Sequence, residues 1–135
     1  MNVKQVVVMR KDLNMRKGKM VAQGSHACMK VFFDRMEKCR HQMGTNIIEP
    51  LYKCDFTKEM EEWKEGIFKK ICVSVDSEQE LMDVYNKAKE ANLPCSLIED
   101  HGLTEFNGVI TKTCCAIGPA NEEDVDKITG ELKLL

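Results

Sequence analysis

The sequence lacks any long apolar run. In its 135 residues, no stretch approaches the roughly 18 consecutive apolar residues of a membrane-spanning helix. The apolar run over residues 6–9 is too short for the core of a signal peptide, and no small-residue cleavage site follows it. These absences predict a cytoplasmic protein that does not partner a membrane.

The sequence also lacks the common motifs of nucleotide, hydrolase and metal sites. It contains no Walker-type phosphate loop, no dinucleotide fingerprint and no Gly-x-Ser-x-Gly elbow. Its seven cysteines include no Cys-x-x-Cys pair, and no His-Glu-x-x-His occurs, so we expect neither a metal site nor a cofactor. The odd cysteine count and the missing secretion signal favour reduced thiols over a disulfide framework.

What is present suits one globular domain, which we predict over residues 1–135. The composition is 43% hydrophobic, and the formal net charge is −2. The charge is unevenly distributed, because residues 1–40 hold ten basic and three acidic residues while the remainder holds ten basic and nineteen acidic ones. A basic N-terminal third predicts a face for a polyanion, unless the two sets of charges interleave in the fold and cancel.

Hydrophobic periodicity predicts strands that alternate with helices. Residues 3–9 are rich in β-branched valine, which is typical of a strand buried on both faces. A long helix is expected over residues 19–43, ended by Gly44-Thr45-Asn46, with an irregular stretch over 45–56. The other expected elements are helices over 58–64, 78–92 and 122–128, with N-caps at Thr57, at Asp76 or Ser77, and at Asn121, and strands over 68–75, 95–98 and 113–117. This alternation predicts a layered α/β domain in which helices cover a small parallel or mixed sheet.

A polar stripe on the long helix is the first candidate site. At 100° per residue, Lys19, Gln23, His26 and Lys30 lie within about 60° of one another on an otherwise largely apolar helix. Polar groups on a largely buried helix must face water, a cleft or buried partners, and the helix N-terminus favours an anion. We interpret the stripe as functional, and a solvated face is the alternative. His26 alone is more often a structural residue than a base.

The second candidate is Asp100, which follows an apolar strand at the start of a loop with Gly102. Loops directly after strands are where α/β proteins place their sites. A half-buried carboxylate there could accept a proton or orient a water molecule. The alternative is a turn aspartate that bonds its own backbone, and the loop alone favours that alternative.

Residues 17–27, which read KGKMVAQGSHA, closely resemble the characteristic pattern of peptidyl-tRNA hydrolases of the archaeal and eukaryotic type. Residues 7–15, 93–100, 116–120 and 128–135 agree with the same family, in the same order. The resemblance implies a three-layer α/β/α sandwich with a small four-stranded mixed sheet, often found as a homodimer. It implies hydrolysis of the ester that joins a peptide to tRNA, with tRNA as the partner and no metal or cofactor.

The resemblance also implies roles for individual residues. Lys19 could stabilise the oxyanion or hold a terminal phosphate, and Asp100 could position or activate the attacking water. The catalytic candidates are Lys19, Asp100, His26, Thr104 and Thr113, and the candidates for holding the tRNA are Gln23, Arg10, Arg16, Lys17 and Lys30.

The loop after Asp100 departs from the family pattern. His101 stands where relatives have alanine, Glu105 where they have glutamine, and residues 107–109 where they have Pro-Gly-Thr. The changed spacing leaves Thr111 and Thr113 competing for one role. The altered loop supports an alternative, a non-catalytic tRNA- or partner-binding module on the same fold. A third hypothesis keeps the esterase chemistry but acts on other acylated tRNAs.

Overall fold

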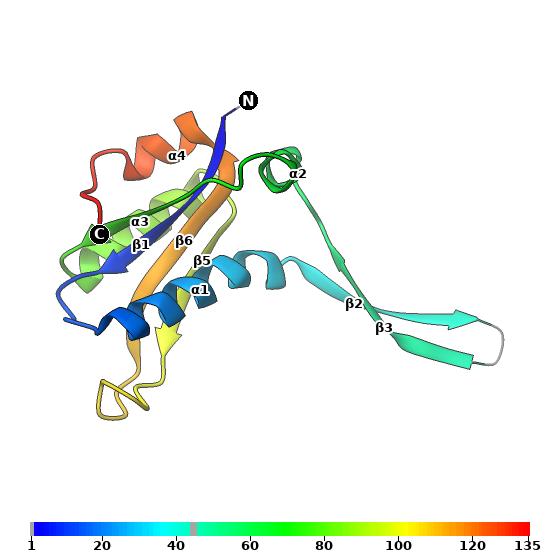
Figure 1. Ribbon diagram of the computed structural model, residues 1–135, viewed down its shortest axis with the longest axis horizontal. Coiled ribbons are helices and arrows are strands. Elements are labelled where there is room, and N and C mark those ends of the chain that lie inside the picture. Colours follow the sequence, from blue (N-terminus) through cyan, green and yellow to red (C-terminus); the bar gives the residue numbers. More distant parts are fainter. Residues whose placement is uncertain (1, 44–45) are drawn as a thin grey trace.

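Four strands form the central mixed sheet of the computed structural model, in the order β4-β1-β6-β5 (Figure 1). Strand β1 runs parallel to β4 and antiparallel to β6, which pairs antiparallel with β5. The structure describes the backbone of residues 2–43 and 46–135 and the side chains of residues 2–39 and 50–135. The elements are β1 (Val3–Arg10), α1 (Lys17–Phe33), β2 (Met36–Met43), β3 (Asn46–Cys54), α2 (Lys58–Glu65), β4 (Lys70–Val75), α3 (Glu78–Glu90), β5 (Cys95–Asp100), β6 (Thr111–Asn121) and α4 (Glu122–Thr129).

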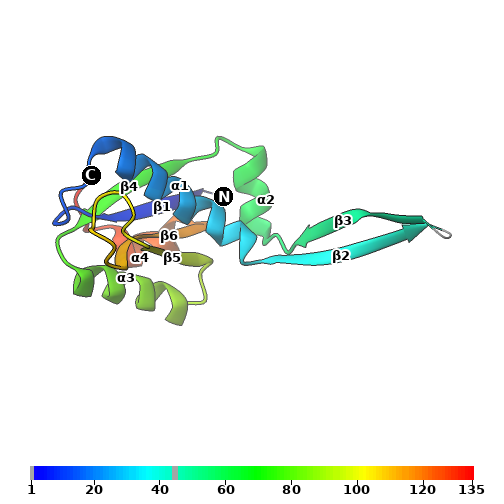
Figure 2. The same cartoon turned by 90° about the horizontal axis from the view of Figure 1, so that it is seen from below.

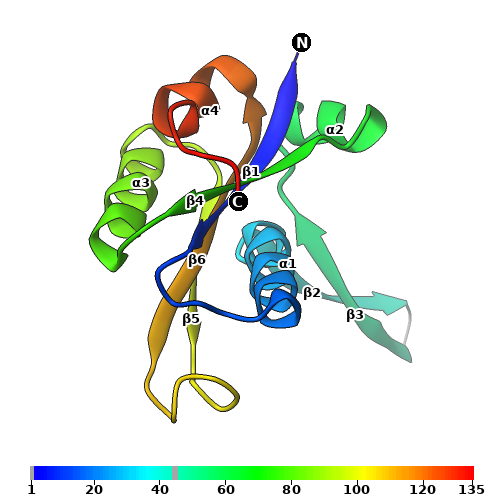
Figure 3. The same cartoon turned by 60° about the vertical axis from the view of Figure 1, so that its left-hand side comes forward.

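Helices cover both faces of this sheet, with α1 and α2 on one face and α3 and α4 on the other (Figures 2 and 3). The side chains of β1 alternate between the two resulting cores, since Val6 and Val8 pack on the α3 and α4 side and Val7 and Met9 on the α1 side. All four are at most 2% exposed. The predicted α/β/α layering and the strand buried on both faces are confirmed.

Side-chain caps begin three of the helices, at the predicted positions. Thr57 accepts a hydrogen bond from the backbone N–H of Met60, Ser77 accepts one from Glu80, and Asn121 accepts one from Glu123. These bonds satisfy N–H groups that have no partner within the helix. In the part of the chain that the structure describes, no helix combines the length and apolar character of a membrane span.

A β-hairpin follows α1, so the prediction of a helix over residues 19–43 was wrong beyond Phe33. Strand β2 pairs antiparallel with β3, which also corrects the expected irregular stretch over 45–56. Val31 is the last α1 residue buried against the sheet, and the charged pair Asp34-Arg35 follows it. Gly44 and Thr45, predicted to end the helix, lie outside the described residues. The hairpin projects from the body of the protein beyond the end of α1 (Figures 1 and 2).

Strands β5 and β6 are both longer than predicted. Strand β5 extends to Asp100 instead of ending at residue 98, and β6 begins at Thr111. Asp100 is therefore paired opposite Thr111 at the end of the sheet. A strand end is held more firmly than a loop residue, which fixes the direction of the Asp100 carboxylate.

Candidate active site

Lys19 and Asp100, 81 positions apart in the chain, meet beside the first turns of α1. The Nζ atom of Lys19 lies 2.9 Å from Oδ1 of Asp100 and 2.8 Å from Oγ1 of Thr104. The two charged side chains are only 13% and 14% exposed. The structure thus joins the polar stripe of the helix to the β5–β6 loop, residues 101–110, beside the start of α1.

Gln23 connects this ion pair to the interior of the protein. Its Nε2 donates to Oδ1 of Asp100 at 3.2 Å, and its Oε1 accepts from the hydroxyl of Thr113 at 2.6 Å. Gln23 is 3% exposed and Thr113 is fully buried. Buried amides and hydroxyls are stable when each finds a partner, and these two satisfy each other. The result is a continuous hydrogen-bonded chain from Thr113 through Gln23, Asp100 and Lys19 to Thr104.

Gly102 lets the backbone turn back onto Asp100. Its N–H donates to Oδ2 of Asp100 at 2.9 Å, and its φ of +76° is a conformation that favours glycine. A Cβ atom at this position would lie 2.5 Å from the carbonyl oxygen of Val109. Asp100 is therefore a turn aspartate through one oxygen, as the alternative predicted, and the partner of Lys19 through the other.

Asp100 is ionised and Lys19 keeps a free donor. Burial favours the neutral form of Asp100, but hydrogen bonds from Lys19, the Gly102 N–H and Gln23, together with the charge of Lys19, hold its pKa below the usual 3.8. An ammonium group carries three N–H donors, and the described residues take up two of them on Lys19, at Asp100 and Thr104. The third is available to a ligand oxygen.

The cations predicted to bind tRNA differ in how available they are. The guanidinium of Arg10 contacts Asp12 at 2.7 Å and the Lys112 carbonyl at 3.0 Å and is 12% exposed, so it is occupied within the fold. Lys30 pairs with Asp34 at 2.9 Å. Lys17 is exposed at the start of α1. Some of the positive charges of the N-terminal third are thus paired with carboxylates, and others are exposed to solvent.

Arg16 also has a carboxylate partner, which sequence reasoning missed. Its Nε lies 2.8 Å from Oε1 of Glu105, although its side chain remains 85% exposed. The ring of Phe106 lies 5.6 Å from Nζ of Lys19, a contact that no motif or spacing in the sequence predicts. Glu105 was visible from the sequence as an acidic departure from the family pattern in a loop expected near a basic segment.

The structure does not bring His26 or Thr111 into the hydrogen-bonded chain. His26 is exposed on α1 and forms no hydrogen bond or ion pair within the described residues. The hydroxyl of Thr111 donates to the carbonyl of Val109 at 2.9 Å. Of the two competing threonines, Thr113 is the one that contacts Gln23.

A comparison with known protein families covers all the residues of this site. The family model described as "Peptidyl-tRNA hydrolase PTH2" matches residues 3–135. This chain belongs to the PTH2 family. The chain is 46% identical over 133 residues to the peptidyl-tRNA hydrolase of Methanocaldococcus jannaschii, covering 98% of this chain and 100% of that protein. It is 43% identical over 136 residues to that of Sulfurisphaera tokodaii, with 100% of both covered. The resemblance predicted from residues 17–27 is confirmed.

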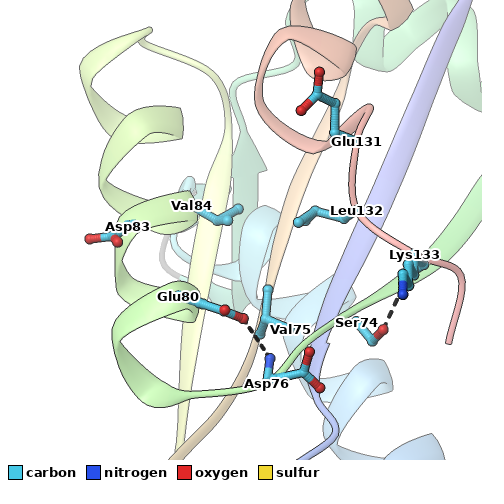
Figure 4. Close-up of a pocket in the computed structure, with 9 residues that line it drawn as sticks. All are labelled: Ser74, Val75, Asp76, Glu80, Asp83, Val84, Glu131, Leu132 and Lys133. Atoms are coloured by element: carbon cyan, nitrogen blue, oxygen red, sulfur yellow. Dashed lines mark hydrogen bonds between the residues drawn. The ribbon is translucent and has the colours of Figure 1, made fainter.

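The opposite layer of this PTH2 chain is acidic. A pocket of about 370 Å³ lies between α3, the end of β4 and the C-terminal segment. Figure 4 shows the side chains that line it, which include Asp76, Glu80, Asp83 and Glu131. Helices α3 and α4 together carry eight acidic residues and three lysines, whereas α1 and α2 together carry four acidic residues, all on α2, and five lysines. Carboxylates repel phosphates, so α1 is the helix of this chain that suits a polyanion, and the α3–α4 layer does not.

The two fully buried thiols of this PTH2 chain, Cys114 and Cys115, are poor candidates for nucleophilic chemistry. All seven cysteines are free, and burial raises the pKa of the Cys114 thiol to about 12 and that of Cys115 still further. A thiol that is protonated at neutral pH is not a nucleophile. Histidine, cysteine and acidic side chains nowhere gather in threes suited to a metal ion within the described ranges.

Proposed function

We propose that this chain hydrolyses the ester bond between a peptide and tRNA, which returns the tRNA for reuse. The family assignment over residues 3–135 supports this reaction. One observation connects it with particular atoms, the contact of Lys19 with both Asp100 and Thr104 at less than 3 Å. This contact gives an ammonium of fixed position with one donor to spare, next to an ionised carboxylate.

In this proposal, Lys19 stabilises the charge that develops during attack. A water oxygen bonds to the ester carbonyl carbon, and the carbonyl oxygen becomes an oxyanion that accepts the free N–H of Lys19. When the carbon–oxygen bond to the ribose breaks, the ribose oxygen leaves with a proton from the attacking water. The second proton of the water is released to solvent, so the products are a peptide carboxylate and a tRNA with a free terminal hydroxyl.

Asp100 orients the water more than it removes the proton. A general base works best when its pKa lies near the operating pH, and the pKa of Asp100 is shifted downward, away from neutrality. Its carboxylate can still accept a hydrogen bond from the water while holding Lys19. Gln23, itself bonded to Thr113, holds Asp100 from the buried side of the site, and Thr104 holds Lys19. His26, exposed one turn beyond Gln23, is the remaining candidate for proton exchange with bound substrate.

The tRNA would approach over the α1 layer, where Arg16 and Lys17 expose their cationic groups. As an enzyme of translation it would act in the cytoplasm, as a single domain over residues 1–135 and as a homodimer. The family resemblance supports these three points, and sedimentation of the purified protein tests the homodimer.

The proposal is tested by incubating purified protein with N-blocked aminoacyl-tRNA without added metal. We expect wild-type protein to release the blocked amino acid, and Lys19→Ala and Asp100→Ala each to lower the rate by about 100-fold or more. Unchanged circular dichroism shows that the variants fold. Lys87→Ala, which removes an exposed lysine of α3, is the matched control and should retain full activity.

An inactive wild-type protein on clean substrate would contradict the proposal. Salt-dependent tRNA binding without hydrolysis would be the result expected of a non-catalytic module, an alternative that the family comparison does not support. Equal rates on blocked and free aminoacyl-tRNA would point to other acylated tRNAs as substrates.

A further inference from the structure

An ion pair fastens the β5–β6 loop to the residue just before α1. Oε1 of Glu105 lies 2.8 Å from Nε of Arg16 and 3.4 Å from its backbone nitrogen. One carboxylate oxygen thus accepts from both the side chain and the main chain of Arg16. This double contact determines where the loop lies relative to the start of the helix.

Glu105 stands between the two loop residues that contact Lys19. Thr104 accepts from Nζ of Lys19 at 2.8 Å, and the ring of Phe106 lies 5.6 Å from the same atom. The N–H of Gly108 donates to the carbonyl of Gly102 at 2.8 Å, which closes the loop on itself. Because the loop is closed internally, a tie at residue 105 also restricts its neighbours on each side.

The carboxylate of Glu105 is largely buried, which would disfavour its charged form without a nearby cation. Its side chain is 14% exposed, and its Oε2 is buried without a hydrogen-bond partner among the described residues. Desolvating a charged oxygen without a partner is unfavourable unless nearby cations compensate. Arg16 supplies this compensation directly. A guanidinium has five N–H donors, so Arg16 keeps donors for solvent or phosphate while holding Glu105.

We propose that Glu105 is a positioning residue for the ester hydrolysis: by fixing the β5–β6 loop to Arg16, it seats the Thr104 hydroxyl on Lys19. This inference rests on the proposed function. A catalytic group displaced by about 1 Å can lose up to 100-fold in rate, so loosening the loop slows turnover even though Glu105 touches no reacting atom.

The test measures kcat and KM of Glu105→Ala and Glu105→Gln on N-blocked aminoacyl-tRNA. We expect Glu105→Ala to lower kcat about tenfold, with KM within about twofold of wild type. Glu105→Gln keeps an oxygen that can accept from Arg16 but loses the charge, so its kcat should fall less, by about threefold. The matched control is Glu65→Gln, which removes an exposed carboxylate paired with Lys64 at 3.0 Å and should leave kcat unchanged.

A double-mutant cycle separates positioning from general loosening of the structure. If Glu105 acts through Thr104, then adding Glu105→Ala to Thr104→Ala should lower kcat by less than about twofold further. The proposal is overturned if wild type hydrolyses substrate and Glu105→Ala has the same kcat, if Glu105→Ala raises KM alone, or if its tenfold loss persists in the Thr104→Ala background. If Glu105→Ala does not fold, Glu105→Gln carries the same three comparisons. An inactive wild type would instead contradict the proposed function.

Discussion

At the scale of single residues, the charged pair of the site depends on an uncharged side chain, that of Gln23. Gln23 bonds the buried hydroxyl of Thr113 through its oxygen and the carboxylate of Asp100 through its nitrogen. An ionised aspartate that is largely covered needs several hydrogen-bond donors. The side-chain amide of Gln23 supplies one of these donors from the buried side of the site, where a charged side chain would be costly to bury. Gln23 therefore contributes to the stability of the fold as well as to the geometry of the site.

We expect Gln23→Leu to lower the free energy of unfolding by about 1–3 kcal/mol, because it removes the oxygen acceptor of the buried Thr113 hydroxyl and one of the two donors to Oδ1 of Asp100. Urea denaturation measures this change. Ser25→Ala is the control on the same helix, since the exposed Ser25 hydroxyl bonds only the Val21 carbonyl of its own turn, at 2.7 Å. Equal stability of Gln23→Leu and wild type would show that the hydrogen-bonded chain contributes nothing.

The lowered pKa of Asp100 has a defined consequence for stability as a function of pH. The native state binds fewer protons than the unfolded chain between the ordinary value of 3.8 and the lower native pKa. The contribution of Asp100 is thus fully present above pH 3.8 and is lost as the pH falls through the native pKa. We expect Asp100→Asn to remove this part of the acid-induced loss, measured by unfolding at a series of pH values. An unchanged pH dependence in Asp100→Asn would mean that other carboxylates account for it.

The residues of the site were partly predictable from the sequence. The spacing of Lys19 and Gln23 placed both on one side of a largely buried helix, and Asp100 followed an apolar strand. The choice between Thr111 and Thr113 was not predictable, because it depends on which point of β6 lies beside Gln23. A register shift between Ile98 and Glu99 sets that point, and a β-bulge leaves no clear mark in a single sequence.

At the scale of elements, the β2–β3 hairpin differs most from the rest of the fold. Its strands pair with each other and not with the four-stranded sheet. The sequence pattern failed here because residues 36–43 show no alternation of apolar and polar residues, and Met36, Cys39 and Met43 continue a helical spacing. The elements predicted best, β1, α2, α3 and α4, are those with a continuous apolar run or a side-chain cap.

Removing the hairpin should leave the body folded. Met36 and Cys54 are paired across the ribbon, so replacing residues 37–53 with Asn-Gly closes the gap with a tight turn. We expect a change in the free energy of unfolding of about 1 kcal/mol or less, measured by urea denaturation, because few contacts with the sheet are lost. A large loss of stability would show that the hairpin contacts something in solution, such as a second copy.

At the scale of the whole molecule, the two helical layers differ in net charge, and an exposed lysine on each layer tests which of them binds tRNA. Lys17 is exposed at the start of α1, and Lys87 is exposed on α3 in the opposite layer. We expect Lys17→Ala to weaken tRNA binding several-fold at low salt and to reduce the slope of log affinity against log salt by about 1, whereas Lys87→Ala changes neither. Filter binding over a salt series measures both. Equal effects of the two substitutions would mean that tRNA does not prefer the α1 layer.

The uneven distribution of charge between the two helical layers gives the molecule an electric dipole across the sheet. In the field of a nucleic acid, such a dipole experiences a torque before any contact forms. The protein would then meet an approaching polyanion with α1 foremost in a larger share of collisions than chance allows. Productive encounters would become more frequent without any gain in the strength of the final complex.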